Sequence, residues 1–416
     1  MTLEQLDRLA VEVEEEIKEI SREIEKNSFA NHKKVLEEFI RAGVGDYHLK
    51  GSTGYGYNDA ARDKLEEIYS GVFKSESSLV RGQIVSGTHA IALCLFGILR
   101  PGDELLAVQG TPYDTIVRMI GIHGDDPGSL KDMGVTYRQV ELLGDGSPDL
   151  AKISSAINNR TKMVYIQRSR GYSLRPSLSM EELSGLIRFI RQCKKDLVVF
   201  VDNCYGEFVE DREPIEVGAD LTAGSLIKNP GGGLAPSGGY ITGKKSLVQM
   251  AANRWTAPGV GGEIGPSQSD IRLFYQGLFM APRCVAEALH GAVFAARFFE
   301  RLGYKTVPAY NEPRTDIIQA IVLGSPEKVI KFCKGIQMSS PVDSGAVPEP
   351  DDMPGYESKI IMAAGTFIQG ASLELSADAP IRQPYAVFAQ GGLSRHYTRI
   401  ALINAALMLE NRSILP

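Results

Sequence analysis

The chain has 416 residues, of which 43% are hydrophobic and 23% charged, and its 45 basic and 51 acidic residues give a formal net charge of −6. This length is too great for one compact core and indicates two domains, while the composition is that of an ordinary globular protein. The sequence shows no sustained basic stripe and no run approaching the roughly 20 apolar residues of a membrane span. We therefore expect neither a nucleic acid nor a membrane as a partner.

The cysteines and the N-terminus indicate the compartment. The five cysteines are odd in number, widely spread and never in a Cys-x-x-Cys pair, which argues against a disulfide framework or a zinc site and fits a reducing environment. The six histidines are equally scattered, so no metal site is predicted. Residues 1–26 are dense in Glu, with Leu and Ile at helical spacing, a pattern opposed to a signal or transit peptide. We expect a cytoplasmic protein.

In chain order, residues 1–50 come first as an N-terminal helical arm, which we expect to pack on the small domain or on a partner chain. Residues 51–265 then form a large domain, because short apolar runs alternate with amphipathic stretches from about residue 80 to 245. Such alternation predicts parallel strand pairing and an open α/β sheet. The expected strands are 83–85, 105–108, 135–140, 163–166, 197–201, 221–227 and 240–241, and the expected helices are 90–99, a stretch from Tyr113, and 180–193.

The pattern changes after residue 265. Residues 271–302 predict a long linking helix, and the rest of 266–416 predicts a smaller C-terminal α/β domain. Apolar runs at 317–322 and 359–366 predict strands of this domain, and residues 400–409 predict its last helix. Between the two strands, residues 341–355 are rich in Pro, Asp and Gly and predict an exposed loop.

Two chemically active residues follow buried strands of the large domain. Asp202 comes directly after 197–201, so its carboxylate would lie at the carboxyl edge of the sheet, where open α/β folds bind ligands; an Asp-Asn pair also suits an ordinary turn. Lys228 ends an apolar run, with Ser225 three residues before it and a glycine run after it. Burial there would lower the pKa of the amine and make it a nucleophile suited to a Schiff base. A solvated loop lysine is the alternative.

A third group precedes both. Ser86, Gly87 and Thr88 stand between a predicted strand and its helix, where backbone N–H groups and hydroxyls form a phosphate cup; an ordinary N-cap is the alternative. The order of phosphate cup, strand-end carboxylate and Ser-x-x-Lys suits pyridoxal phosphate, which needs a phosphate site, an acid partner for its pyridine nitrogen and an amine for its aldehyde. We therefore predict pyridoxal 5'-phosphate as the cofactor.

Three stretches carry a resemblance to a known family. They are 167–172 (Gln-Arg-Ser-Arg-Gly-Tyr), 201–207 (Val-Asp-Asn-Cys-Tyr-Gly-Glu) and 228–233 (Lys-Asn-Pro-Gly-Gly-Gly). From about residue 30 onward the chain resembles the fold-type I pyridoxal-phosphate enzymes. It more closely resembles the cystathionine and methionine gamma-lyase group, and within it the cystathionine beta-lyase-like bacterial branch called aluminium resistance proteins. The resemblance implies an aspartate aminotransferase-like large domain followed by a smaller α/β C-terminal domain.

Position by position, the resemblance implies which residues hold the cofactor. Lys228 resembles the Schiff-base lysine, Asp202 the partner of the ring nitrogen, and Tyr205 the phenol that hydrogen-bonds the ring hydroxyl; these three are the implied catalytic residues. Tyr113 resembles the aromatic residue that stacks on the pyridine ring, although a half-buried Tyr at a helix start is a serious competitor. The implied phosphate-binding residues are Ser86, Gly87, Thr88 and Ser225, with Tyr55, Tyr57 and Arg62 reaching across from a neighbouring subunit.

The chain departs from the lyases in two places. Residues 168–172 replace a Pro-Thr-Asn-Pro-like turn, and Cys204 stands where the lyases carry Thr. Arginines near a cofactor pocket suit a substrate carboxylate, which Arg holds with two hydrogen bonds, but a strand-end Arg is also a common structural pair. The candidate substrate-binding residues are Arg168, Arg170, Tyr172 and Arg382, with Arg382 ranked slightly above Arg399.

The resemblance implies β- or γ-elimination on a sulfur amino acid of the cystathionine or methionine class, giving a 2-oxo acid, ammonia and a thiol. Two alternatives remain: aminotransferase or aldolase chemistry on the same scaffold, and a non-catalytic pyridoxal-phosphate protein acting in metal tolerance. We expect a homodimer or homotetramer with shared active sites, because residues 54–57 (Gly-Tyr-Gly-Tyr) are too flexible and too aromatic for an ordinary surface loop.

Overall fold

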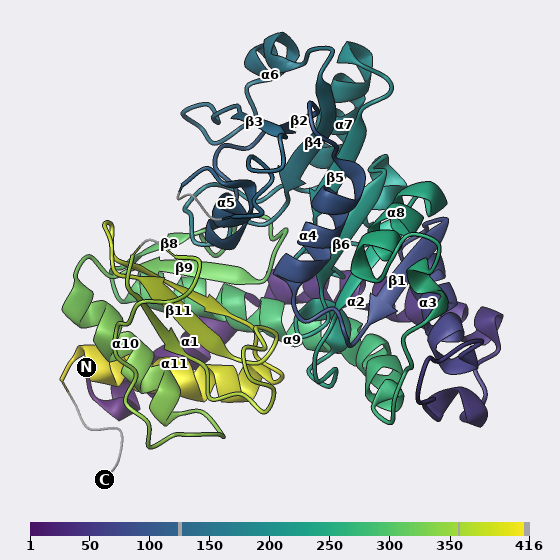
Figure 1. Cartoon of the computed structure of the whole chain (residues 1–416). Coiled ribbons are helices and arrows are strands. Elements are labelled where there is room, and N and C mark those ends of the chain that lie inside the picture. Colours follow the sequence, from purple (N-terminus) through teal and green to yellow (C-terminus); the bar gives the residue numbers. More distant parts are fainter. Residues whose placement is uncertain (124–126, 357, 412–416) are drawn as a thin grey trace.

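The computed structural model describes residues 1–123, 127–356 and 358–411. A seven-stranded sheet forms the centre of the large domain (Figure 1), with the strand order β1-β7-β6-β5-β4-β2-β3. Strands β3, β2, β4, β5 and β6 run parallel, whereas β7 runs antiparallel to both β6 and β1. The open α/β sheet is confirmed, with an antiparallel pair at one edge that was not predicted. The strands are β1 (Ser77–Arg81), β2 (Glu104–Ala107), β3 (Thr136–Gln139), β4 (Thr161–Gln167), β5 (Val198–Asp202), β6 (Leu221–Ser225) and β7 (Gly239–Gly243).

The first strand that we predicted is wrong. Residues 83–85 lie in the turn before helix α4 (Gly87–Ile98), and the strand is β1, earlier in the chain. In the pairing of β1 with β7, Ser78 Oγ lies 2.7 Å from Thr242 Oγ1. Only Leu79 and Val80 of β1 are apolar, and both are buried opposite Ile241 and Tyr240. An apolar run of two residues beside two serines is too short to predict a strand. Ile84, which suggested a strand, is instead a fully buried turn residue.

Helices cover both faces of the large sheet. Helices α4, α5 and α8 bury one apolar cluster with the sheet, and α7 buries another on the opposite face. Because side chains alternate along a strand, Phe200 of β5 belongs to the first cluster, whereas Val199 and Val201 belong to the second. The helices of this domain are α3 (Ala60–Val72), α4, α5 (Asp114–Ile120), α6 (Leu150–Ala156), α7 (Met180–Cys193) and α8 (Lys245–Trp255).

A five-stranded antiparallel sheet forms the core of the small domain, in the order β10-β11-β12-β9-β8. Helices α10 and α11 pack against each other beside it (Figure 1). Strands near 317–322 and 359–366 are confirmed, and the other three were missed. Residues 305–307 form a strand of only three residues, and 376–380 (Ser-Ala-Asp-Ala-Pro) are mostly small, whereas 386–390 (Ala-Val-Phe-Ala-Gln) carried an apolar signal that we did not use. The elements are β8 (Lys305–Val307), β9 (Ile318–Val322), α10 (Pro326–Met338), β10 (Ile360–Ala363), β11 (Ser376–Pro380), β12 (Ala386–Gln390) and α11 (Arg395–Leu409).

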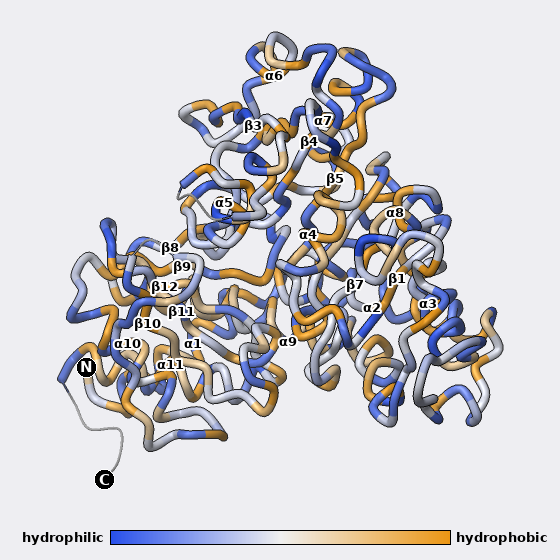
Figure 2. Tube along the Cα trace, viewed as in Figure 1, coloured by the Kyte–Doolittle hydropathy of each residue, from blue (hydrophilic) through white to orange (hydrophobic). Residues whose placement is uncertain are grey.

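The long helix α9 (Ile271–Arg301) runs between the two domains (Figure 1). Within the part of the chain that the structure describes, it is the one helix long and apolar enough to cross a membrane, yet 83% of its most apolar window is buried inside the protein. Figure 2 shows apolar segments concentrated in this helix and in the two sheets. Our expectation that no run approaches membrane length is therefore corrected. The burial of α9 is that of the core helix of a soluble protein.

The N-terminal residues form two helices, α1 (Leu3–Glu16) and α2 (Lys18–Ala42), that pack on α9 of the same chain. Helix α1 also packs on α11. Arg297 and Arg301 of α9 both form ion pairs with Glu16, and Arg395 of α11 pairs with Glu25 at 2.8 Å. These contacts attach the N-terminal helices to the small domain.

Candidate active site

The carboxyl ends of β4, β5 and β6 meet at one edge of the large sheet and face the small domain. A cavity of about 250 Å³ opens there. Its wall contains residues from both domains, among them Ser376 of β11 and Gln390 of β12. The structure brings together in this cavity the predicted residues Ser86, Gly87, Thr88, Tyr113, Tyr172, Asp202, Tyr205, Ser225 and Lys228.

The residues predicted to form a phosphate cup lie at the start of α4. Ser86 is the N-cap, and its Oγ accepts a hydrogen bond from the His89 N–H at 3.0 Å. A Cβ placed on Gly87 would lie 3.2 Å from both Cys204 Sγ and Ser225 Cβ. A side chain at this position would therefore crowd Cys204 and Ser225, whereas glycine leaves the space beside the helix start open.

Asp202 lies at the end of β5, as predicted, and is buried. One carboxylate oxygen accepts a hydrogen bond from the Tyr165 hydroxyl at 3.1 Å, and the other accepts one from the Cys204 N–H at 3.1 Å. Burial raises the pKa of Asp202, although the nearby Lys228 ammonium opposes this effect. A cationic partner such as a protonated pyridine nitrogen would favour the ionised form of Asp202.

Lys228 follows β6, and its Nζ lies 3.8 Å from the centre of the Tyr205 ring. Burial by itself would lower the pKa of the Lys228 amine, as we predicted. Cys204, Tyr205 and Asp202 outweigh burial, however, and the pKa is raised overall. The predicted lowering is thus wrong for the cofactor-free site, where the neighbours of Lys228 stabilise the ammonium.

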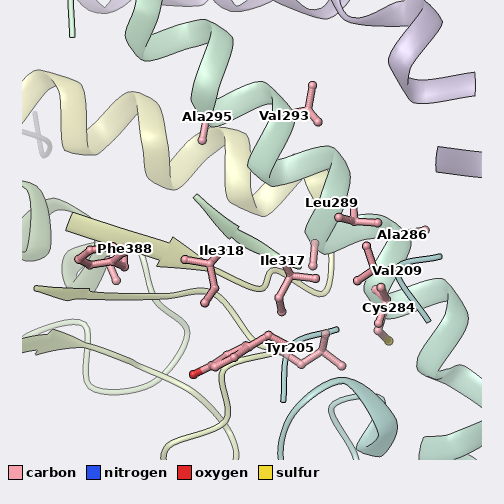
Figure 3. Close-up of a cluster of buried hydrophobic side chains, with 14 of the residues drawn as sticks. Tyr205, Val209, Cys284, Ala286, Leu289, Val293, Ala295, Ile317, Ile318 and Phe388 are labelled. Atoms are coloured by element: carbon pink, nitrogen blue, oxygen red, sulfur yellow. The ribbon is translucent and has the colours of Figure 1, made fainter. Parts of the chain in front are cut away.

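Tyr205 connects the cavity to the core between the domains. Figure 3 shows it at the edge of a buried cluster that joins α9 to Ile318 of β9 and Phe388 of β12. Its hydroxyl lies 3.4 Å from Ser372 Oγ of the small domain. Tyr205 therefore contacts both sides of the cleft.

Three tyrosines, Tyr113, Tyr172 and Tyr356, form an aromatic wall of the cavity. The sequence predicted Tyr113 and Tyr172 as site residues but not Tyr356. The hydroxyls of Tyr113 and Tyr356 lie 2.6 Å apart, and the ring centres of Tyr113 and Tyr172 are 5.5 Å apart. Burial raises the pKa of Tyr113 and Tyr172, so both phenols stay neutral and keep a proton to donate. Tyr356 follows the predicted loop at 341–355, and nothing in its local sequence distinguished it.

Asp378 of β11 is a second carboxylate in the cavity, and sequence reasoning missed it. It accepts hydrogen bonds from the Tyr172 hydroxyl at 2.9 Å and from Gln390 Nε2 at 2.8 Å. Burial raises its pKa to about 6. The only signal for Asp378 in the sequence was an acidic residue within a run of small residues, Ser-Ala-Asp-Ala-Pro. This run does not have the pattern of a β-strand.

The predicted arginines separate into two kinds. Arg168 lies outside the cavity and is fully buried. It donates hydrogen bonds to Asn203 Oδ1 at 3.0 Å and Gly206 O at 2.6 Å, and it forms an ion pair with Glu210. These contacts occupy the Arg168 guanidinium within the protein, so its role is structural. Arg170 and Arg382 instead line a second cavity, of about 690 Å³, that adjoins the first.

Tyr55, Tyr57 and Arg62 do not reach the cofactor cavity of their own chain. The two tyrosine side chains are 70% and 65% exposed, with ring centres 5.6 Å apart. Arg62 is buried, and its Nη1 donates hydrogen bonds to Gly56 O at 2.8 Å and Gly265 O at 3.2 Å. Arg62 thus fixes the base of the loop that carries both tyrosines.

The described residues fit pyridoxal phosphate on their own chemistry. The Gly87 cradle provides N–H groups and hydroxyls for a phosphate, Lys228 provides the amine, and buried Asp202 provides an acid partner for a ring nitrogen. Within the described residues, no group of three or more His, Cys, Asp or Glu side chains could hold a metal ion. The fold and this site together define a fold-type I pyridoxal-phosphate enzyme scaffold.

The chain belongs to the methionine gamma-lyase family, whose model matches residues 6–410. It is 50% identical over 413 residues to the uncharacterized protein YnbB of Bacillus subtilis, covering 99% of this chain and 98% of that one. It is 26% identical over 225 residues to the L-methionine gamma-lyase of Pseudomonas putida, covering 54% of this chain and 51% of that one.

Solved structures give the same relationship. A Listeria monocytogenes protein described as a candidate cystathionine beta-lyase involved in aluminium resistance is 48% identical, with a TM-score of 0.95 over 97% of this chain and 100% of that one. A carbon-sulfur lyase involved in aluminium resistance from Clostridium novyi is 44% identical, with a TM-score of 0.93 over 97% of this chain and 95% of that one. The metB protein of Corynebacterium glutamicum, at 18% identity and a TM-score of 0.56 over 84% of each chain, shares the fold.

Proposed function

We propose that this protein is a pyridoxal-phosphate-dependent carbon-sulfur lyase that performs β- or γ-elimination on a sulfur amino acid of the cystathionine or methionine class. The observation that carries the proposal is that Lys228 and Asp202 face one cavity in a chain of the methionine gamma-lyase family. The products would be a 2-oxo acid, ammonia and a thiol.

When bound, the cofactor supplies an electron sink for the charge left on the substrate when a proton leaves Cα. Lys228 Nζ would hold the cofactor covalently, and its free amine would be the base that takes the proton from Cα of the substrate. Asp202 would hold the proton on the ring nitrogen, and its burial would strengthen this interaction. Ser86, Gly87 and Thr88 would bind the phosphate.

The departing sulfur needs a proton, and the aromatic wall holds candidates for it. Tyr113 keeps its phenolic proton because burial raises its pKa, and its contact with the Tyr356 hydroxyl fixes the orientation of its oxygen. We assign Tyr113 the role of proton donor to the leaving thiolate. The contact of Tyr205 with Ser372 of the small domain would help to exclude water from the cavity and favour elimination over side reactions.

The experiment is a panel of sulfur amino acids, including cystathionine, methionine, cysteine and homocysteine, given to the holoenzyme, with thiol, ammonia and 2-oxo acid measured together. Stoichiometric release of all three supports the lyase. Amino transfer to an added 2-oxo acid without ammonia would point to an aminotransferase, and cofactor binding without turnover would point to a non-catalytic role. We further propose that the protein works in the cytoplasm as a homodimer or homotetramer.

A further inference from the structure

The cofactor cavity contains a carboxylate that the elimination described above does not use. Asp378 of β11 lies on the cavity wall and is buried, and it belongs to the small domain, whereas Asp202 and Lys228 come from the large domain. Its hydrogen-bond partners in the described part of the chain are the neutral Tyr172 hydroxyl and Gln390 amide. A buried carboxylate whose partners are neutral is costly. Such a group in the cavity of a reactive lysine is a candidate for proton transfer.

A chain of hydroxyl groups connects Asp378 to Tyr113, the proposed proton donor. The Tyr172 hydroxyl donates a hydrogen bond to the Asp378 carboxylate at 2.9 Å and also interacts with the Tyr113 phenol. The ring centres of the two tyrosines are 5.5 Å apart, and the Tyr113 hydroxyl lies 2.6 Å from that of Tyr356. Because the proton of Tyr172 points at Asp378, the Tyr172 oxygen is free to accept a proton from the cavity. The chain of hydroxyls therefore has a proton donor at one end and a carboxylate at the other.

Asp378 can gain and lose a proton near neutral pH. Burial raises the pKa of its carboxyl to about 6, although the hydrogen bonds from Tyr172 and Gln390 and the charge of the Lys228 ammonium oppose this effect. Burial also raises the pKa of the other titratable groups that face it, which are the phenols of Tyr172, Tyr205 and Tyr356 and the thiol of Cys333 in α10. These neighbours keep their protons across the neutral range, so Asp378 is the group among them that titrates there.

An amino-acid substrate enters with an ammonium group, which must lose a proton before its nitrogen can act as a nucleophile. The leaving thiolate later needs a proton. We propose that Asp378 serves both steps, taking the ammonium proton through Tyr172 and returning it to the thiolate through Tyr172 and Tyr113. These three residues are the proton relay. This inference rests on the proposed lyase function and adds to it a residue that stores the proton between the two steps.

Protons and electrons balance in the proton relay. On entry, an N–H bond of the ammonium breaks, its proton binds the Tyr172 oxygen, and the Tyr172 proton moves to the Asp378 carboxylate. On departure, Tyr113 gives its proton to the sulfur, Tyr172 restores the proton of Tyr113, and Asp378 restores that of Tyr172. One proton enters and one leaves, and no oxidant or reductant takes part. Because Asp378 acts through the tyrosines, it is a positioning residue.

The first test follows, by NMR, the exchange of the Cα proton of L-methionine and S-methyl-L-cysteine with D2O on the holoenzyme. This exchange requires the substrate ammonium to lose its proton, whatever group leaves afterwards. We expect wild-type kcat/KM for exchange to fall about tenfold per unit as the pH drops below about 6, because protonated Asp378 cannot take the ammonium proton. Asp378→Asn should lower the plateau above this pH about 100-fold and remove the fall.

Three further variants test the connection. Tyr172→Phe should reproduce the pH profile of Asp378→Asn, and the double variant should be no slower than the slower single one, because both changes interrupt the same relay. Asp378→Glu keeps a carboxylate and should keep the fall below about pH 6. Asp196→Asn is the control, an exposed change before the amino end of β5, and should match the wild type.

A carboxyl titration reports on Asp378 without turnover. In holoenzyme that carries ¹³C at its aspartate carboxyls, NMR should show a signal that titrates at about pH 6 in the wild type and is absent from Asp378→Asn. Its midpoint should rise in Tyr172→Phe, because the charged carboxylate then loses a hydrogen bond. If Cα exchange depends on Asp378 in this way but no thiol is released, the relay stands and the lyase proposal fails alone.

Two results would overturn the relay and leave the lyase proposal in place. A slower Asp378→Asn variant whose pH profile is unchanged would show that this carboxylate only supports Tyr172 structurally. An Asp378 carboxyl with the pKa of an ordinary aspartate would show that it cannot store the proton near neutral pH.

Discussion

The Nζ atom of Lys228 lies 3.8 Å from the centre of the Tyr205 ring. Tyr205 follows the end of β5 by three residues, and Lys228 follows the end of β6 by three. Tyr205 has a left-handed backbone conformation, with φ of 73°, which is unfavourable for a residue with a side chain. The surrounding fold enforces this strain, with Tyr205 held in the core between the domains. Such backbone strain is common at functional sites, and here it occurs at the residue whose ring contacts Lys228.

The first prediction concerns the attachment of the cofactor. Purified protein should absorb visible light, lose that band on borohydride reduction, and retain the reduced label on Lys228, because this amine lies in the cavity beside Asp202. Lys244 instead forms an ion pair with Asp220 at 2.7 Å outside the cavity. Peptide mapping by mass spectrometry is the measurement. Label on Lys244 or Lys245 would refute the assignment, and a Lys228→Ala chain is the control that should carry none.

The second prediction concerns Asp202. Asp202→Asn should keep the cofactor but lower kcat by about 100-fold or more, because a neutral amide cannot hold the proton on the ring nitrogen. Tyr165→Phe is the matched variant: it removes one hydrogen bond to the same carboxylate and should cost about tenfold or less. Steady-state rates and the cofactor content of both variants are compared with those of the wild type. Wild-type turnover in Asp202→Asn would disprove the ring-nitrogen role.

The third prediction concerns Glu207, which is fully buried below the site. Its Oε1 accepts a hydrogen bond from the Tyr240 hydroxyl at 2.7 Å, while its Oε2 has no partner among the described residues. Burial raises its pKa from about 4.5 to about 8. The folded protein therefore binds this proton more tightly than the unfolded chain, and the free energy of unfolding falls as pH rises from about 4.5 to about 8.

Glu207→Gln removes this titration. Its free energy of unfolding relative to the wild type should increase by roughly 2–5 kcal/mol across that range and then level off. Urea unfolding of both proteins at a series of pH values is the measurement, with the exposed Glu181→Gln as the control. Parallel pH profiles for Glu207→Gln and the wild type would mean that Glu207 has an ordinary pKa.

The sequence predicted the site residues that follow a strand or begin a helix in the large domain. It failed for residues whose place in the site depends on contacts with distant parts of the chain. Asp202 ends β5 and Lys228 follows β6, two neighbouring parallel strands whose carboxyl ends meet at one edge of the sheet. Ser86 begins a helix, and the sequence marks it as an N-cap. Asp378 was missed because a strand of the small domain brings it to the cavity from far along the chain. We predicted Arg168 as a substrate-binding residue because it lies near other site residues in the sequence. Its contacts with Asn203, Gly206 and Glu210 instead keep it outside the cavity.

The last prediction concerns a site shared between subunits. We propose that Tyr55 and Tyr57 reach the phosphate site of a partner chain, because both are exposed aromatic side chains that their own chain leaves uncovered. Arg62 holds the loop from below through Gly56 O, so it positions the tyrosines from its own chain. A closed twofold assembly would place the loop of each subunit beside the other's cofactor cavity.

Complementation tests this arrangement. A Lys228→Ala chain is mixed with a Tyr55→Ala/Tyr57→Ala chain under conditions in which subunits exchange, and exchange is monitored by native mass spectrometry. If the site is shared, a hybrid dimer has one cavity with both lesions and one with neither, so about half of the hybrid's cavities should be active. The control mixes Lys228→Ala with Asp202→Asn, whose lesions lie in the same chain's cavity, and activity should not return. Demonstrated exchange without recovery in the tyrosine mixture would show that these tyrosines serve their own chain.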